Sequence, residues 1–246
     1  MGKGLTMENV SYIGLSKQIA LKSQMDITAN NIANMSTPGY KAQDMLFSEY
    51  LTQPKGGDKI SQVVNRNSFR RDEQGALAQT GNPLDLALQG DGYFSVETPE
   101  GVFYTRAGNF TLSNEGEIVT SEGYKLLNKE GAPFQIPKGD SQIAIVGNGI
   151  VSTERGELGQ IGVFKFENDQ NLIKVGGNLY SGGELNPETA DKTLVRQGMI
   201  ESSNVKSIIE MNKMIEILRQ YQSTQNMIKT DHDRQRNAIT KLTRVT

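Results

Sequence analysis

The C-terminal part of the chain carries a helical pattern that is too long for one compact domain to cover. Residues 204–242 contain neither Gly nor Pro, and such a run predicts a single helix of about 39 residues and about 58 Å. Since a domain of ordinary size cannot bury a stripe of that length, we expect the helix to pack on a second helix and on other chains. The stripe recurs at spacings of three and four residues and consists of Met211, Met214, Leu218, Tyr221, Gln225, Ile228, His232, Gln235, Ile239 and Leu242.

A second helical pattern lies near the N-terminus, over residues 9–34. The helix should end near Ser36, because Pro38 disfavours helical dihedrals at the residue before it. Its seam recurs at heptad-like spacing and consists of Leu21, Met25, Thr28, Ile32 and Met35. Both ends of the chain thus carry apolar seams, and we expect the two helices to pair as a discontinuous, coiled-coil-like domain.

The middle of the chain has a β pattern. Between Gly90 and Gly131 a turn signal that ends in Gly arrives every seven to nine residues, and runs of β-branched and aromatic residues lie between these turns. Regular short strands with tight turns predict an antiparallel meander, sandwich or barrel. The runs cover residues 93–96, 102–105, 117–120, 124–127, 143–145, 163–166 and 172–175.

These patterns together predict an α+β fold with discontinuous terminal helices and a central all-β, antiparallel domain. We assign residues 1–40 and 200–246 to a terminal helical polymerisation domain and residues 81–180 to the β domain. Segments 41–80 and 181–199 are polar and rich in Gly, which predicts extended connectors between the two.

The composition argues against catalysis and against metal or cofactor sites. The chain has no Cys, and its single His, His232, leaves only one candidate base for a catalytic triad. A net charge of −2 creates no field that favours nucleic acid. We find no apolar segment long enough to span a bilayer and no signal-peptide pattern near the N-terminus. We therefore expect no enzymatic activity, no cofactor, no nucleic-acid partner, no membrane insertion and no cleaved signal.

A motif follows the N-terminal helix. Residues 29–41 read ANNIANMSTPGYK, which places amides at the end of the helix and a turn at Thr37, Pro38, Gly39 and Tyr40. This stretch resembles the signature of flagellar rod and hook proteins. The chain departs from the family's pattern at two positions of this turn. Tyr40 stands where Phe is commoner, and Pro38 lies within the turn.

Further blocks of the sequence resemble the same family, in the same order. They are residues 80–94, TGNPLDLALQGDGYF; 104–110, YTRAGNF; 178–180, NLY; and 195–205, VRQGMIESSNV. The resemblance therefore covers nearly the whole chain. The short segment between Lys41 and Gly81 makes the chain most similar to the proximal-rod type.

The resemblance implies a structural role. It implies a subunit of the flagellar basal-body rod, which leaves the cytoplasm through the type III export apparatus and assembles helically around the export channel. The partners so implied are further copies of the chain, other proximal and distal rod subunits, the export apparatus and the basal-body rings. The location so implied is the periplasm-spanning rod.

The sequence leaves two other interpretations of the function open. One is a distal-rod or hook-type axial subunit, which has the same kind of terminal helices. The other is a surface-secreted β-domain adhesin or binding module with coiled-coil ends. Deletion of the gene distinguishes them, since only an axial subunit is needed for motility.

Residues on the two seams are the candidates for contacts between subunits. We expect the terminal helices to be partly disordered in the free subunit and to become ordered when neighbours cover their apolar faces. The candidates are Leu21, Met25, Asn30, Asn31, Ile32 and Asn34 in the N-terminal helix and Met214, Leu218, Tyr221 and Ile228 in the C-terminal helix.

Overall fold

The structure is a computed structural model that describes residues 8–52, 60–137, 139, 142–183 and 185–243. Its contacts divide the chain into two compact units. Unit 1 is made of residues up to 33, residues 43–70 and residues from 206 onward, and unit 2 is made of residues 34–42 and 71–205. Two helices and a mostly antiparallel set of strands confirm the α+β fold class.

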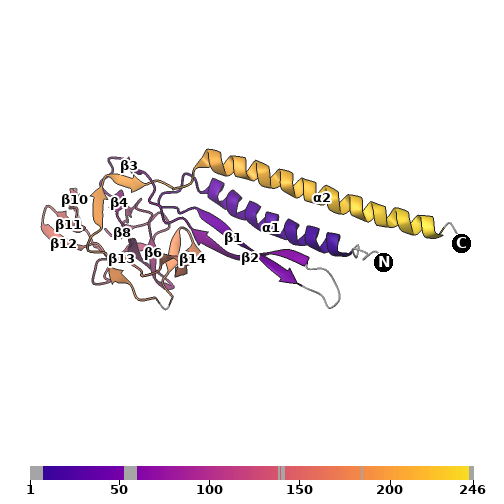
Figure 1. The fold of residues 1–246 in the computed structure, drawn as a ribbon. Helices are drawn as coiled ribbons and strands as arrows, with labels where there is room; N and C mark the ends of the chain where they lie inside the picture. The colour runs from indigo at the N-terminus through magenta and orange to yellow at the C-terminus, as the bar shows by residue number, and fades with distance from the viewer. Residues whose placement is uncertain (1–7, 53–59, 138, 140–141, 184, 244–246) are drawn as a thin grey trace. The chain divides into compact units, whose positions relative to one another are not determined.

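Unit 1 consists of two helices and one hairpin. Its elements are α1 (Glu8–Ala33), β1 (Gln43–Thr52), β2 (Ile60–Arg70) and α2 (Ser207–Thr243). Helix α1 contacts α2 and also both strands of the hairpin, so it lies between them (Figure 1). At lengths of about 39 Å and about 56 Å, the two helices are the longest elements of the chain.

The two helices of unit 1 run antiparallel. Asn31, near the end of α1, contacts Glu210, near the start of α2, whereas Gly14 lies against Ile228, far along α2. A Cβ atom at Gly14 would lie 2.8 Å from Cγ1 of Ile228, so the absence of a side chain allows the helices to approach closely there.

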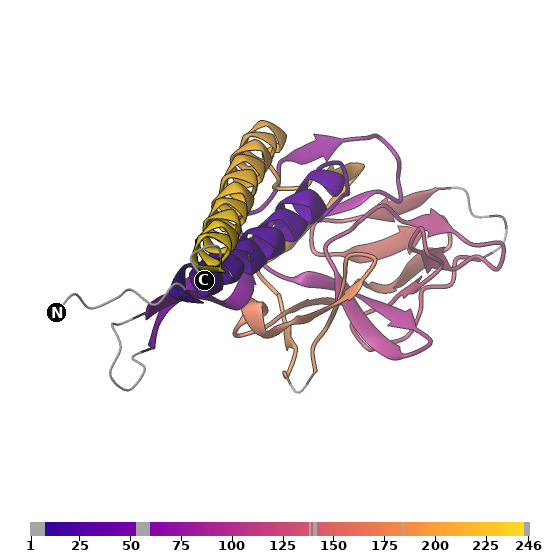
Figure 2. The ribbon, with the colours of Figure 1, turned by 90° about the vertical axis from the view of Figure 1, so that its right-hand side faces the viewer.

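Unit 2 is built from short antiparallel strands (Figure 2). Its main sheet has the order β14-β15-β6-β5-β9-β8-β7, and β13 pairs with both β5 and β16. The strands of this sheet are β5 (Tyr93–Thr98), β6 (Gly101–Thr105), β7 (Thr111–Leu112), β8 (Ile118–Val119), β9 (Lys125–Leu126), β13 (Val163–Lys165), β14 (Ile173–Gly176), β15 (Leu179–Ser181) and β16 (Glu188–Thr189).

Three smaller sheets complete unit 2. One contains β10 (Ile143–Ile145), β11 (Ile150–Thr153) and β12 (Gly156–Gln160), and the two others pair β4 (Leu86–Gln89) with β17 (Leu194–Gln197) and β3 (Leu77–Gln79) with β18 (Met199–Glu201). A single 3₁₀ turn covers Asp169–Asn171. Buried side chains of these sheets form the main core, which includes Leu86, Leu88, Phe94, Val96, Phe110, Ile118, Leu126, Phe134, Val151, Ile161 and Val195.

The two segments that we expected to be extended connectors contain strands. Residues 41–80 hold the β1–β2 ladder, which is continuous except for a bulge between Leu46 and Phe47, and also β3. Residues 181–199 hold β16 and β17. Their polar composition hid these ladders, because backbone hydrogen bonds, which leave no mark on the composition, join the paired strands.

Candidate functional site

The turn after α1 has a backbone shape that only glycine adopts readily. Gly39 has a φ of +68°, and a Cβ atom at this position would overlap the carbonyl group of Arg106. The amide of Tyr40 donates to the carbonyl of Thr37 at 3.3 Å, which closes the turn. Residue 39 must therefore be glycine both for its backbone angle and for the space around it.

Residues from distant parts of the sequence hold this turn in place within unit 2. The amide of Gly39 donates to the carbonyl of Glu201 at 2.7 Å, and the side-chain amide of Asn178 donates to the carbonyl of Pro38 at 2.9 Å. The ammonium of Lys174 lies 4.5 Å from the centre of the buried Tyr40 ring. The turn is thus a junction where four of the sequence blocks that we compared with rod proteins meet.

A buried ion triad lies next to the turn, and we call it the Glu201 triad. The carboxylate of Glu201 is 2.7 Å from Nζ of Lys41 and 3.2 Å from a guanidinium nitrogen of Arg106. The Glu201 side chain is 1% exposed. Burial lowers the pKa of Lys41 below its ordinary value, although the Glu201 charge and hydrogen bond act in the opposite direction. With one carboxylate between two cations, the triad compensates charges that would be costly to bury alone.

Backbone groups add further hydrogen bonds to the Glu201 triad. Lys41 Nζ also donates to the carbonyl of Glu73 at 2.9 Å, and Arg106 donates to the carbonyl of Gly90 at 2.8 Å. The amide of Gly75 donates to Glu201 at 3.0 Å. The three side chains therefore join five segments of unit 2 and are inaccessible to a substrate, which is the arrangement of a structural site.

Asn204 joins the segment before α2 to the segment after the turn. Its side-chain oxygen accepts from the amide of Ala42 at 2.7 Å, and its nitrogen donates to the carbonyls of Arg71 and Glu73 at 3.0 and 2.9 Å. From the sequence alone, Asn204 and Glu201 were recognised only as parts of a motif, without a structural role. Their position just before a long helix was the available signal, but it does not reveal their partners.

Asn31 plays a similar part within unit 1. Its side-chain nitrogen donates to the carbonyl of Gln43 at 2.8 Å, and its oxygen accepts from the amide of Gln43 at 2.9 Å. The amide group thereby imitates a peptide of a neighbouring strand and fixes the start of β1 beside α1. Asn31 is 0% exposed, so in this conformation its partners are inside the chain.

The other candidate residues occupy different environments. Leu21 is buried, whereas Leu218 is 39% exposed. Asn30 is exposed. The other six candidates are half-buried, namely Met25, Ile32, Asn34, Met214, Tyr221 and Ile228. Their predicted role in contacts between subunits stays a prediction.

The face of α2 that the chain itself buries lies one residue earlier than the apolar pattern indicated. Glu210, Ile217, Thr224 and Asp231 are buried, and they recur at intervals of seven residues. Half-buried residues lie between them at the same interval, namely Met214, Tyr221, Ile228 and Gln235. Three of the four buried positions are polar, so a count of apolar residues could not find them.

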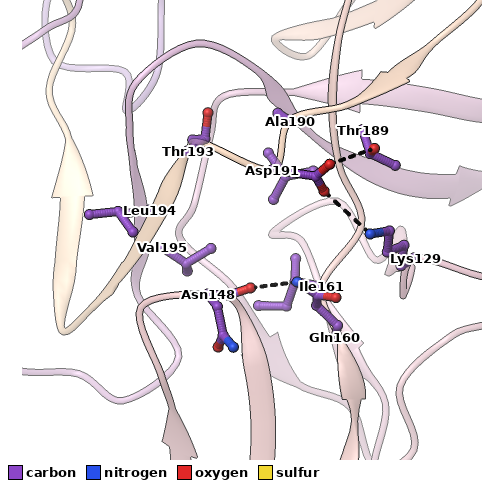
Figure 3. A pocket seen from close by; sticks show the side chains of 11 residues that line it. Lys129, Asn148, Gln160, Ile161, Thr189, Ala190, Asp191, Thr193, Leu194 and Val195 are labelled. Atoms are coloured by element: carbon purple, nitrogen blue, oxygen red, sulfur yellow. Dashed lines mark hydrogen bonds and ion pairs between the residues drawn. The ribbon is translucent and has the colours of Figure 1, made fainter.

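A pocket of about 100 Å³ lies in unit 2 (Figure 3). Lys129 pairs with Asp191 at 3.3 Å across its rim, and the hydroxyl of Thr189 donates to the same carboxylate at 3.4 Å. Over the described part of the chain, no cluster of His, Asp and Glu has the composition of a metal site, and neither helix is apolar over a length that could cross a membrane.

Comparison with known families gives three matches along the chain. Residues 12–41 match "Flagella basal body rod protein". Residues 87–153 match "Flagellar hook protein FlgE/F/G D1 domain", and residues 196–241 match "Flagellar basal body rod FlgEFG protein C-terminal". The first match contains the turn, the second contains Arg106, and the third contains Glu201 and Asn204.

Individual relatives are similar over almost their whole length. The flagellar basal-body rod protein FlgF of Caulobacter vibrioides is 34% identical, over 97% of this chain and 100% of the relative. FlgF of Rhizobium meliloti is 34% identical over 87% of this chain and 90% of the relative. FlgG of Bacillus subtilis is 34% identical over 90% of this chain and 94% of the relative.

Proposed function

Because the chain belongs to the flagellar basal-body rod protein family, and is thus a structural subunit of the rod rather than an enzyme, we propose that it assembles helically through α1 and α2 into the axial shaft around the export channel. The observation that carries this proposal is the number of large apolar side chains that both helices leave exposed, among them Leu15, Ile19, Ile208 and Ile215. A monomer gains nothing from exposing them, whereas an assembly buries them.

The two helices form the polymerisation domain, with residues 1–40 and 200–246 as its two parts. The seven-residue interval of Glu210, Ile217, Thr224 and Asp231 supports coiled-coil-like pairing of α1 with α2. Residues 81–180 form the β domain. The segments on either side, 41–80 and 181–199, lead from one to the other.

The candidate residues contribute to assembly in two ways. Leu218 and Asn30 are exposed and can contact a neighbour directly. Leu21 and Asn31 are covered by the chain itself, so they act by holding the helix pair in the shape that neighbours bind. The half-buried Met25, Ile32, Asn34, Met214, Tyr221 and Ile228 contribute to both.

The partners are further copies of this chain, the other proximal and distal rod subunits, the type III export apparatus and the basal-body rings. The chain works in the periplasm-spanning rod of the basal body and reaches it without a cleaved signal. The end-to-end match with a FlgF protein supports the proximal rod, and the FlgG relatives keep the distal rod as the second candidate.

Deletion of the gene tests this function. Electron microscopy of detergent-extracted basal bodies should show rings without a completed rod or hook, and the length of the remaining stump places the subunit as proximal or distal. Normal flagella and swimming in the deletion strain would overturn the rod assignment and favour a surface-exposed binding module.

A further inference from the structure

The segments of unit 2 that continue into unit 1 meet at one place. Residues 34–42 of unit 2 come before the β1–β2 hairpin, residue 71 follows it, and residue 205 precedes the part of unit 1 that contains α2. Asn204 joins all three segments. Its side chain accepts from the amide of Ala42 at 2.7 Å and donates to the carbonyl of Arg71 at 3.0 Å. Its own amide donates to the carbonyl of Tyr40 at 3.3 Å.

Contacts between the N-terminal and C-terminal parts of the chain form a nested series that starts from this place. The first pair lies within unit 2, and the next two lie within unit 1. From one pair to the next, the first partner moves toward the N-terminus and the second toward the C-terminus. The pairs are Gly39 with Glu201, Asn31 with Glu210, and Gly14 with Ile228. In such a series each pair shortens the loop that the following pair has to close.

The length of this loop makes the first contact between α1 and α2 unfavourable in an unfolded chain. Asn31 and Glu210 are 179 residues apart in the sequence. Once unit 2 joins Gly39 to Glu201, only about 17 residues of flexible chain remain in the loop between them. Because the probability of closing a flexible loop falls with about the −3/2 power of its length, folded unit 2 should favour the pairing by about 30-fold.

A factor of this size matters because the helix pair has little apolar burial of its own. Among the helix residues whose burial the structure describes, the buried apolar side chains are Ala20, Leu21 and Ile217. The buried polar ones are Thr28, Asn31, Glu210, Thr224 and Asp231, and burial of polar groups that must keep hydrogen bonds contributes little net stability. Both apolar clusters of the described chain belong to unit 2. The pairing is therefore marginal, and the loop length decides whether it occurs.

We propose that folded unit 2 gates the pairing of α1 with α2. The helices pair only while the junction of Gly39 with Glu201 is closed, and the pairing proceeds from Asn31 and Glu210 toward the ends of the chain. An unfolded chain therefore has no paired helices and acquires them when unit 2 folds. The consequence for assembly rests on the proposed function: a subunit can join the rod only after its unit 2 has folded.

Fluorescence energy transfer within the purified full-length chain tests this gate, since the chain contains no Cys of its own. Leu15→Cys/Met227→Cys places a donor and an acceptor at exposed positions of α1 and α2, at the end of the nested series farthest from the junction. Near-UV circular dichroism reports on unit 2 through its buried Tyr93, Tyr104 and Tyr180. The labelled chain in buffer should show both signals, and absence of transfer while unit 2 is folded would contradict the proposal.

A substitution inside unit 2 then opens the gate without changing either helix. Val96→Asp places a charge at a fully buried position of β5 and should abolish the near-UV signal and the transfer together. The matched control is Thr111→Asp, which introduces the same charge at an exposed position of β7 and should keep both signals. Ile118→Asp, at a fully buried position of β8, gives an independent reading if Val96→Asp aggregates.

The decisive outcome is whether the two signals separate in these variants of unit 2. Loss of the near-UV signal with retained transfer would overturn the proposal, because the helices would then pair without unit 2. This result would leave the rod function standing, since deletion of the gene tests that function separately. Joint loss in Val96→Asp and joint retention in Thr111→Asp are the results that the gate predicts.

Discussion

The two units of the chain bury their side chains in different ways. Unit 2 surrounds an apolar core with short strands and satisfies its buried charges internally, in the Glu201 triad. Unit 1 buries polar side chains such as Glu210 and Asp231 between its elements while it leaves Ile208 and Ile215 in solvent. We infer that unit 2 is stable by itself, whereas unit 1 obtains part of its stability from neighbours.

The largest effect is expected from the Glu201 triad. Glu201→Gln removes the carboxylate that the buried cations Lys41 and Arg106 share and should lower the free energy of unfolding of unit 2 by about 3–5 kcal/mol. Urea unfolding followed by near-UV circular dichroism measures this. The exposed Glu97 of the main sheet provides the control, since Glu97→Gln should change little, and similar stability of the two variants would contradict the role of the triad.

A smaller loss is expected at the turn. Gly39→Ala combines an unfavourable left-handed backbone with overlap against Arg106 and should cost about 2–4 kcal/mol. Gly123 also has a positive φ but has nothing near its missing Cβ, so Gly123→Ala measures the backbone term alone. The same urea titration compares the two variants, and equal costs would show that the close approach at the junction contributes nothing.

Replacement of the buried amide in unit 1 should have a moderate effect. Asn31→Leu leaves both backbone groups of Gln43 without their partner and should lower the free energy of unfolding of unit 1 by about 1–3 kcal/mol. Far-UV circular dichroism during denaturation reports on this loss. Asn30→Leu, at the exposed neighbour, should be close to neutral, and the reverse ranking of the two variants would overturn the account of this motif.

The smallest effect on the subunit should accompany a complete loss of assembly. Leu218→Asp changes an exposed side chain, so the free energy of unfolding of the monomer should stay within about 0.5 kcal/mol. Swimming should nevertheless be lost, because the change places a charge on the face of α2 where Met211, Ile215 and Leu218 are exposed. Cells with Ser223→Asp, at an exposed position off that face, should swim normally, and motile Leu218→Asp cells would remove α2 from the assembly surface.

The sequence predicted the α+β class, the terminal helices and most strands of the main sheet, because period and turn signals are local. It did not predict that the buried face of α2 is set by Glu210, Thr224 and Asp231, since these residues are polar and their partners are distant in the chain. For the same reason the sequence showed Glu201 only as part of a motif and did not predict its role. Its function depends on Lys41 and Arg106, which are brought together only by the fold.

Amide hydrogen exchange of the purified full-length subunit tests the contrast between the two units most directly. Our account predicts that amides of α1 and α2 exchange much faster than those of β5 and β6, and that the helices become protected in isolated basal bodies. Helices protected in the free subunit as strongly as these strands would contradict it, because the terminal helices would then need no neighbours.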